Sequence, residues 1–150
     1  MLKSLLKKLK FGTVLPPQIK NNGACANNTY YDTQGLASVL FLMIIGALDV
    51  VVGSTDTDTP LYLEECDTTD GDFTKVADSD LAAVIADDGD NKLRAVAVDL
   101  TATHKRYIRW NAPTAGNATG ANVASIAIGF PADVLPSTAA EQGLAELVEA

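Results

Sequence analysis

The stretch Leu36–Gly53, LASVLFLMIIGALDVVVG, carries a single ionisable residue, Asp49. It is near the lower length limit for a helix that crosses a bilayer. A glycine and Asp49 interrupt it, β-branched residues crowd its second half, and it lacks a basic flank. We therefore predict no membrane span but two strands, Ala37–Ile45 and one that starts within Val50–Gly53, joined by a tight turn at Gly46–Asp49.

The first of these predicted strands is apolar on both faces. One face carries Val39, Phe41, Met43 and Ile45, and the other carries Leu40, Leu42 and Ile44. A strand of a β-sandwich needs only one apolar face, because the other face meets water. We therefore expect the face of Leu40, Leu42 and Ile44 to be covered by a terminal arm, a sister subunit or another protein shell.

Further short segments alternate between apolar and polar residues with the period of two that marks a strand half-buried in a sheet. Clusters of Asp, Asn, Gly and Thr separate them, as expected for turns. This pattern predicts an all-β domain, a β-sandwich or jelly roll, over residues 29–130. The predicted strands are Thr29–Thr33, Thr59–Cys66, Leu93–Leu100, Lys105–Trp110 and Ala121–Phe130, and Ser79–Ala86 is left open between a helical turn and an irregular segment.

Residues 1–28 are predicted to form a basic N-terminal arm. Leucines at helical spacing, with lysines on the opposite face, favour a short amphipathic helix over residues 2–10 that needs a surface to dock on. The following residues, 11–28, contain a Pro-Pro pair and many small turn formers, so we expect an extended linker there. The candidate contact residues of this arm are Leu2, Leu5, Leu6, Leu9, Lys3, Lys7 and Lys10.

Residues 131–150 are predicted to form a C-terminal tail that contains a short helix. Thr138 and Glu141 have the spacing of a capping box, and an apolar stripe follows. Gly143 weakens the helix by about 1 kcal/mol, so this segment also needs a surface to lie on. The candidate contact residues of the tail are Leu144, Leu147 and Val148.

The formal net charge of −8 is unevenly distributed. Residues 1–29 hold five lysines and no acid, whereas residues 30–150 hold six basic and nineteen acidic side chains. Such an acidic body argues against nucleic-acid binding, which requires a cationic face. His104 is the only histidine, the two cysteines form no CxxC motif, and no common catalytic motif is present, so we expect no enzyme and no cofactor.

Two polar features leave alternatives open. The acidic turns of residues 56–58, 67–72 and 87–90 could bind calcium, but they lack EF-hand spacing and are better explained as solvated turn acids. In HKRYIRW, residues 104–110, cations alternate with aromatic residues. We expect the aromatic side chains to enter the core and the cations to pair with acids. The alternative is a carbohydrate-binding β-sandwich in which Tyr107 and Trp110 stack on sugars.

The order of four segments resembles a known family. They are YYDTQGLASVLFLMIIGALD, LYLEECDTTDGDFTKVADSDL, DDGDNKLRAVAVDLTATHKRYIRW and TGANVASIAIGFPADVLP, and together they cover about residues 29–136. The pattern is similar to that of the capsid decoration (cement) proteins of tailed bacteriophages. The chain departs from it at Phe73, where the family pattern has tryptophan.

This resemblance implies a β-sandwich or jelly roll without an active site. It also implies a homodimer or homotrimer that binds the major capsid protein on the outer surface of the virion and is assembled in the host cytoplasm. Neither nucleic acid nor a membrane is an expected partner. A head–tail joining or tail component is a further alternative.

Overall fold

Every regular element in the part of the chain that the structure describes is a β-strand. The computed structural model describes residues 8–117 and 120–132. Its strands are β1 (Lys10–Lys20), β2 (Gly23–Ala24), β3 (Tyr31–Asp32), β4 (Leu36–Leu48), β5 (Val52–Ser54), β6 (Leu63–Cys66), β7 (Thr74–Lys75), β8 (Leu93–Asp99), β9 (Tyr107–Trp110), β10 (Pro113–Ala115) and β11 (Ala121–Pro131). The all-β prediction is therefore confirmed for these residues.

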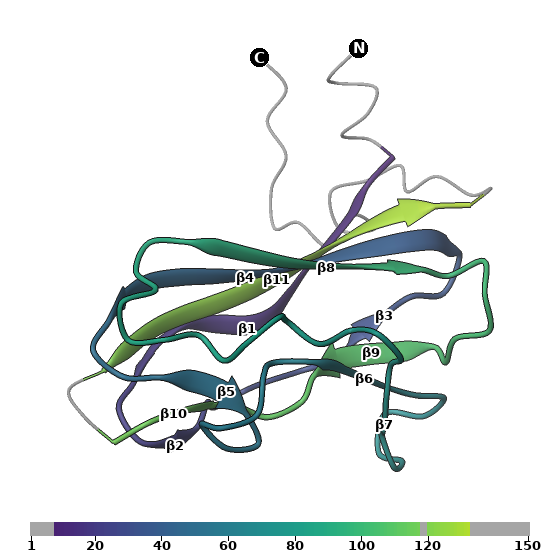
Figure 1. Ribbon diagram of the computed structural model, residues 1–150. Helices are drawn as coiled ribbons and strands as arrows, with labels where there is room; N and C mark the ends of the chain where they lie inside the picture. The colour runs from purple at the N-terminus through teal and green to yellow at the C-terminus, as the bar shows by residue number, and fades with distance from the viewer. Residues whose placement is uncertain (1–7, 118–119, 133–150) are drawn as a thin grey trace, which may run out of the picture.

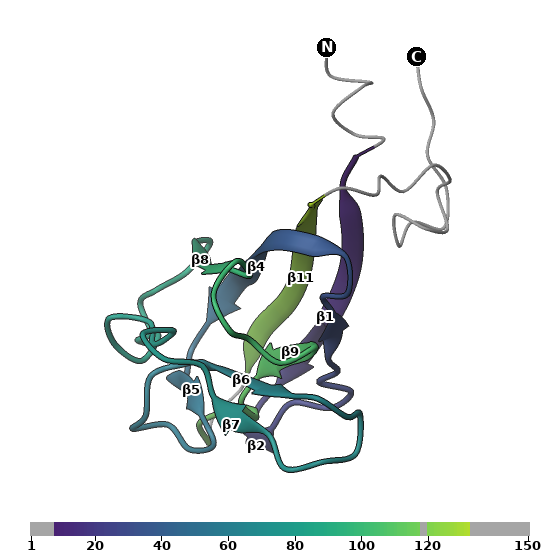
Figure 2. The same cartoon turned by 90° about the vertical axis from the view of Figure 1, so that its right-hand side faces the viewer.

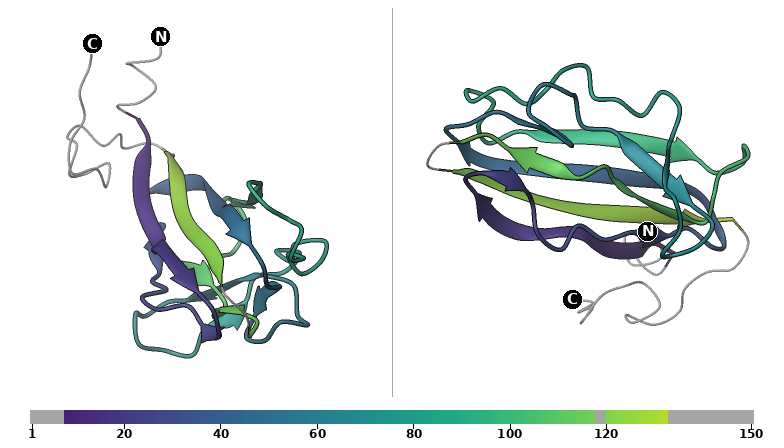
Figure 3. Two further views of the ribbon diagram at one scale, coloured as in Figure 1. Left: turned by 90° about the vertical axis from the view of Figure 1, so that its left-hand side faces the viewer. Right: turned by 90° about the horizontal axis from the view of Figure 1, so that it is seen from below.

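The strands form three antiparallel sheets that stack in two layers (Figure 1 and Figure 2). The main sheet has the strand order β1-β11-β4-β8. Two smaller sheets, β2-β10-β5 and β3-β9-β6-β7, lie across one of its faces (Figure 3, right). Only Asn111 and Ala112 separate β9 from β10, so the chain passes directly from one small sheet into the other. The arrangement is that of a β-sandwich.

The core lies between the two layers. β4 sends Val39, Phe41, Met43 and Ile45 into it, and all four are almost fully buried. Trp110 enters from β9 on the opposite layer, with its ring edge-on to Phe41 at 6.3 Å between centroids. Such edge-to-face pairs add to the stabilisation that comes from burying the rings.

β11 alternates small residues toward the core with large residues away from it. The core-facing side chains are small because aromatic groups of the opposite layer occupy the space above them. The Trp110 indole N–H donates to Ser125 Oγ at 2.7 Å, and a β-carbon on Gly129 would lie 2.5 Å from the Tyr31 hydroxyl. The sequence pattern predicted that Ala124, Ile126, Ile128 and Phe130 share one face. They do, but it is the face turned away from the core.

Strand β1 corrects the expectation that residues 11–28 form a linker outside the core. Residues 10–20 pair with β11 along most of its length, and Val14 and Leu15 have no exposed surface. The two prolines do not end this strand, because β1 lies at the sheet edge and carries an irregularity between Leu15 and Gln18. An edge strand tolerates the missing N–H groups of proline. Residues 8–10 are likewise not helical, while residues 2–7 of the predicted helix lie outside the described residues.

The apolar stretch that dominates the sequence forms β4 and β5, as predicted, with its turn three residues later than expected. β4 continues through Gly46 to Leu48. Gly46 serves packing instead of a turn, since a β-carbon there would lie 2.9 Å from the Asn122 β-carbon. Within the described ranges, no helix is long and apolar enough to cross a membrane.

The remaining strand predictions are confirmed, with shorter boundaries except for β11, which extends one residue further, to Pro131. β3, β6, β8, β9 and β11 each lie within or nearly coincide with a predicted segment. Residues 79–86 form no regular element, apart from a single bridge between Ile85 and Val52. The predicted C-terminal helix, with its cap at Thr138, lies outside the described residues.

Candidate functional site: an apolar sheet face

The face of the main sheet that points away from the core is apolar. We call it the outer face. Strand register aligns its side chains in rows: Leu42 of β4 pairs with Ile126 of β11 and with Ala95 of β8, and Leu40 pairs with Ile128 and Ala97. Among the described residues, its only ionisable side chain is Asp99, which pairs with Ser38 at one end of the face. Its other side chains are Phe11, Thr13, Leu40, Leu42, Ile44, Leu93, Ala95, Ala97, Ala124, Ile126, Ile128 and Phe130.

No described segment covers the outer face. Ile44 is 37% exposed, Phe130 38% and Leu93 65%, while Leu40 and Leu42 are half-buried by their neighbours in the sheet. The sequence predicted Leu40, Leu42 and Ile44 on this face but not the contributions of β8 and β11. The alternation of small and large residues in β11 separates its two faces but does not tell which of them meets the core.

A shallow groove opens at one end of the outer face. It has a volume of about 470 Å³ and lies among β1, β4 and β11, with Ile44, Gly46 and Asn122 among its lining residues. Ile19 also lines it and is 72% exposed, so this side chain projects beside the groove. The combination of a projecting aliphatic group and a neighbouring hollow gives the face a distinct shape.

The structure describes only two of the candidate contact residues of the N-terminal arm and the C-terminal tail. Lys10 lies at the start of β1, where its ammonium donates to the Asp32 carbonyl oxygen at 2.7 Å and sits 5.4 Å from the centre of the Tyr31 ring. Leu9 is buried. These two residues therefore hold the arm to the domain itself. The other candidates lie outside the described residues, namely Leu2, Leu5, Leu6, Lys3, Lys7, Leu144, Leu147 and Val148.

The opposite layer presents a charged surface. Arg106 binds the Asp32 carboxylate through two N–H groups, at 2.9 and 2.7 Å. These hydrogen bonds are the main reason that the pKa of Asp32 is lowered. Arg109 donates to Glu64 at 2.6 Å and lies 3.9 Å from the centre of the Phe73 ring. The predicted pairing of the HKRYIRW cations with acids is confirmed for both arginines.

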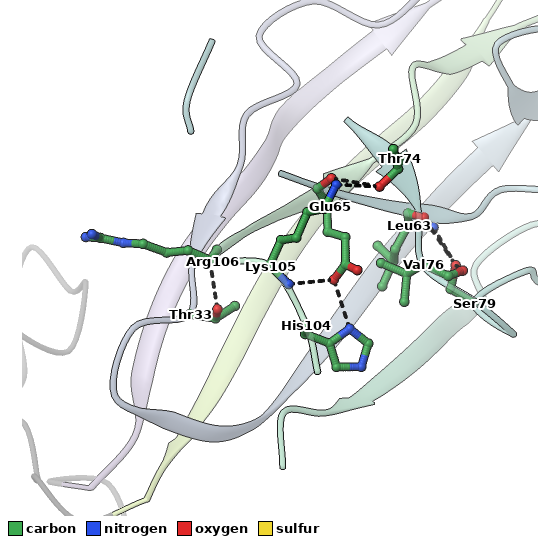
Figure 4. Close-up of polar contacts among 9 residues, drawn as sticks. All are labelled: Thr33, Leu63, Glu65, Thr74, Val76, Ser79, His104, Lys105 and Arg106. Atoms are coloured by element: carbon green, nitrogen blue, oxygen red, sulfur yellow. Dashed lines mark hydrogen bonds and ion pairs between the residues drawn. The ribbon is translucent and has the colours of Figure 1, made fainter. Parts of the chain in front are cut away.

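Glu65 links β6, to which it belongs, to the residues that lead into β9 (Figure 4). Its carboxylate lies 2.8 Å from His104 Nδ1 and accepts the backbone N–H of Lys105 at 3.1 Å. The Lys105 ammonium donates to Thr74 of β7 at 2.9 Å. The only histidine of the chain is thus a half-buried partner of Glu65 that helps fix the loop before β9.

Trp110 is unavailable as a sugar platform. It has no exposed surface, and its N–H is used inside the core. This corrects the carbohydrate-binding alternative, in which Trp110 and Tyr107 both stack on sugars. Tyr107 is half-buried against Tyr30 and Arg106.

The acidic turns use their carboxylates to close loops. Asp56 accepts the backbone N–H groups of Asp58 and Thr59, and Asp90 accepts that of Leu48. Among residues 8–117 and 120–132, no group of three or more His, Cys, Asp or Glu side chains could hold a metal ion. Both cysteines are buried free thiols, and burial raises the pKa of Cys25 to about 11.

The chain was compared with protein-family models, curated proteins and solved structures. None of these comparisons produced a match. The two outer surfaces of the sandwich are therefore the features of this chain that bear on its function.

Replacing Arg109 by methionine should lower the free energy of unfolding by about 1–2 kcal/mol, because it leaves the buried Glu64 carboxylate without its partner. Urea denaturation at pH 7 measures the change. Arg106→Met is the matched control, since its pair with Asp32 is exposed to solvent and should matter less. Equal losses in the two variants would contradict the assignment of Glu64 as the more buried partner.

Proposed function

We propose that this chain is a structural virion protein, a capsid decoration protein that binds the outer surface of a tailed-phage head and stabilises contacts between capsomers. The observation that carries the proposal is the contrast between its two surfaces. An apolar outer face that needs a protein cover lies opposite a charged surface built from arginine–carboxylate pairs. A protein with one apolar and one charged surface binds other proteins through the apolar side and faces solvent with the charged side.

The order of sequence motifs supports the same proposal, because it resembles the decoration proteins over about residues 29–136. The proposal includes a jelly-roll relationship to that family and an N-terminal arm that reaches the major capsid protein through Lys3 and Lys7. The acidic remainder of the chain would face solvent and keep particles apart by like-charge repulsion. Self-association as a homodimer or homotrimer belongs to the same proposal.

Purified full-length protein should bind to heads of the encoding phage that lack it, and should saturate at on the order of hundreds of copies, as expected for a component that follows icosahedral symmetry. Co-sedimentation followed by quantitative mass spectrometry measures the copy number. Absence of binding would overturn the proposal. Saturation at about six or twelve copies would instead indicate a head–tail joint.

The role of the arm is tested in the full-length chain. Lys3→Glu/Lys7→Glu should weaken head binding if the basic arm is the anchor. The control Lys20→Glu/Lys92→Glu makes the same change in net charge within the described domain and should bind like the unmodified protein. Deletion of residues 1–20 is not a suitable test, because it would remove all of β1 from the main sheet.

A further inference from the structure

We infer that a second copy of this chain covers the outer face of the main sheet, so that two sheets stack face to face about a two-fold axis. The orientation of β11 supports this inference. Its core-facing residues are Ala121, Val123, Ser125, Ala127 and Gly129, whereas Ile126, Ile128 and Phe130 point outward. A strand with one face in water shows polar residues there. β11 therefore has the pattern of a strand that is buried on both faces.

The extent of the outer face also suits a dimer contact. β1 and β11 each have eleven residues. β4 has thirteen residues and β8 has seven. At about 3.3 Å per residue and about 4.8 Å between strands, these four strands together cover on the order of 600 Å². The accessible surface of interdigitating side chains exceeds this flat projection, and a standard interface buries about 800 Å² per partner. The size of this face is therefore close to what a standard dimer interface needs.

The outer face is chemically self-complementary. A two-fold interface brings the same patch of both copies together, so both copies place charges of the same sign on one contact. The only ionisable side chain that the described residues place on the outer face is Asp99 at one end, although the whole chain has a net charge of −8. Two copies can therefore meet on the rest of this surface without like charges at the contact. The projecting Ile19 beside the groove gives each copy both a knob and a hollow for the other.

The other occupants explain the face less well. A nucleic acid or an anionic membrane surface requires cations, and the outer face supplies none. A helix from the C-terminal segment would cover a strip about 10 Å wide. The four-stranded face is about 19 Å wide, so such a helix would leave half of it exposed.

Sedimentation velocity of the full-length protein across a concentration series tests the inference. The expected species has twice the mass of one chain, and it should persist at high salt because the contact is apolar. Leu42→Glu should weaken dimerisation at least 100-fold, since it places a charge at the centre of the interface. Thr74→Glu adds the same charge on exposed β7 of the opposite layer and should leave the dimer intact.

The unmodified protein supplies a second measurement that does not depend on a variant that folds. The methyl groups of Ile126 and Ile128 should be shielded from a soluble paramagnetic probe in the dimer and become accessible on dilution. A monomer at all concentrations overturns the inference, whether its methyl groups are accessible or are shielded by its own terminal segments. A dimer that Leu42→Glu leaves unchanged also overturns it.

The inference rests on the proposed function in that it names the surface used for self-association, but it can be tested apart from capsid binding. A dimer that does not bind heads would contradict the proposed function alone, and a monomer that coats heads would contradict the dimer alone. If both hold, the outer face is the sister contact, and the arm and the rim of the sandwich remain for the shell.

Discussion

Replacing Trp110 by alanine should lower the free energy of unfolding by about 3–5 kcal/mol, the range for removing a large buried aromatic side chain. Trp110 is one of the largest fully buried side chains in the described part of the chain, and it connects the two layers. Its ring packs edge-on against Phe41 of β4, and its N–H donates to Ser125 of β11. The neighbouring positions of β11 are small, so no side chain there can fill the cavity.

This loss is a large share of the 5–15 kcal/mol that is typical for a whole domain. Urea denaturation followed by circular dichroism measures it, because tryptophan fluorescence is lost with the substitution. Trp110→Phe is the control, since it retains a ring against Phe41 and leaves Ser125 with its hydrogen bond to the Leu42 carbonyl oxygen. We expect a clearly smaller loss for this variant. A loss below about 1 kcal/mol for Trp110→Ala would show that the indole is not central to the core.

Replacing Gly53 by alanine should cost about 3 kcal/mol, the upper end of the usual range for overpacking, because the obstacle is backbone. A β-carbon at this position of β5 would overlap the Asp56 carbonyl oxygen and lie 2.6 Å from that of Thr59. The loop that carries both oxygens is fixed, since Ser54 N donates to Thr59 O and the Asp56 carboxylate caps two further N–H groups. The loop cannot move away without breaking these bonds.

Gly116→Ala is the matched control for the Gly53 substitution. The nearest atom to a β-carbon at Gly116 is the Val50 β-carbon at 3.6 Å, an ordinary van der Waals contact. Thermal unfolding of both variants should therefore show a substantial decrease in melting temperature only for Gly53→Ala. Similar melting temperatures would mean that the loop of residues 54–59 can be displaced at little cost.

The strands in which apolar and polar residues clearly alternate were predictable, and the edge strand β1 was not. β8 and β9 each show one apolar face, and the structure buries Val98, Ile108 and Trp110 as expected. β1 was missed because its prolines and small residues resemble a linker. Its partner β11 is about 100 residues away, so no local pattern could indicate that the prolines lie at an edge.

The candidate site was predictable in kind but not in extent. A strand with two apolar faces requires a cover on the second face, and this inference identified Leu40, Leu42 and Ile44. The direction in which β11 faces could not be predicted, because both of its faces are apolar. Only the position of Trp110 above Ser125 shows that the small residues belong to the core and the large ones to the outer face.

The pairing of the first described strand with the last has a consequence for synthesis in the cell. The main sheet cannot be completed until β11 has left the ribosome, about 100 residues after β1. At a translation rate of roughly 5–20 residues per second, β1 and β4 lack this neighbour for on the order of 5–20 s. β4 is apolar on both faces. A nascent chain with such exposed surface is prone to aggregation, so its yield should depend on chaperones that hold it during translation.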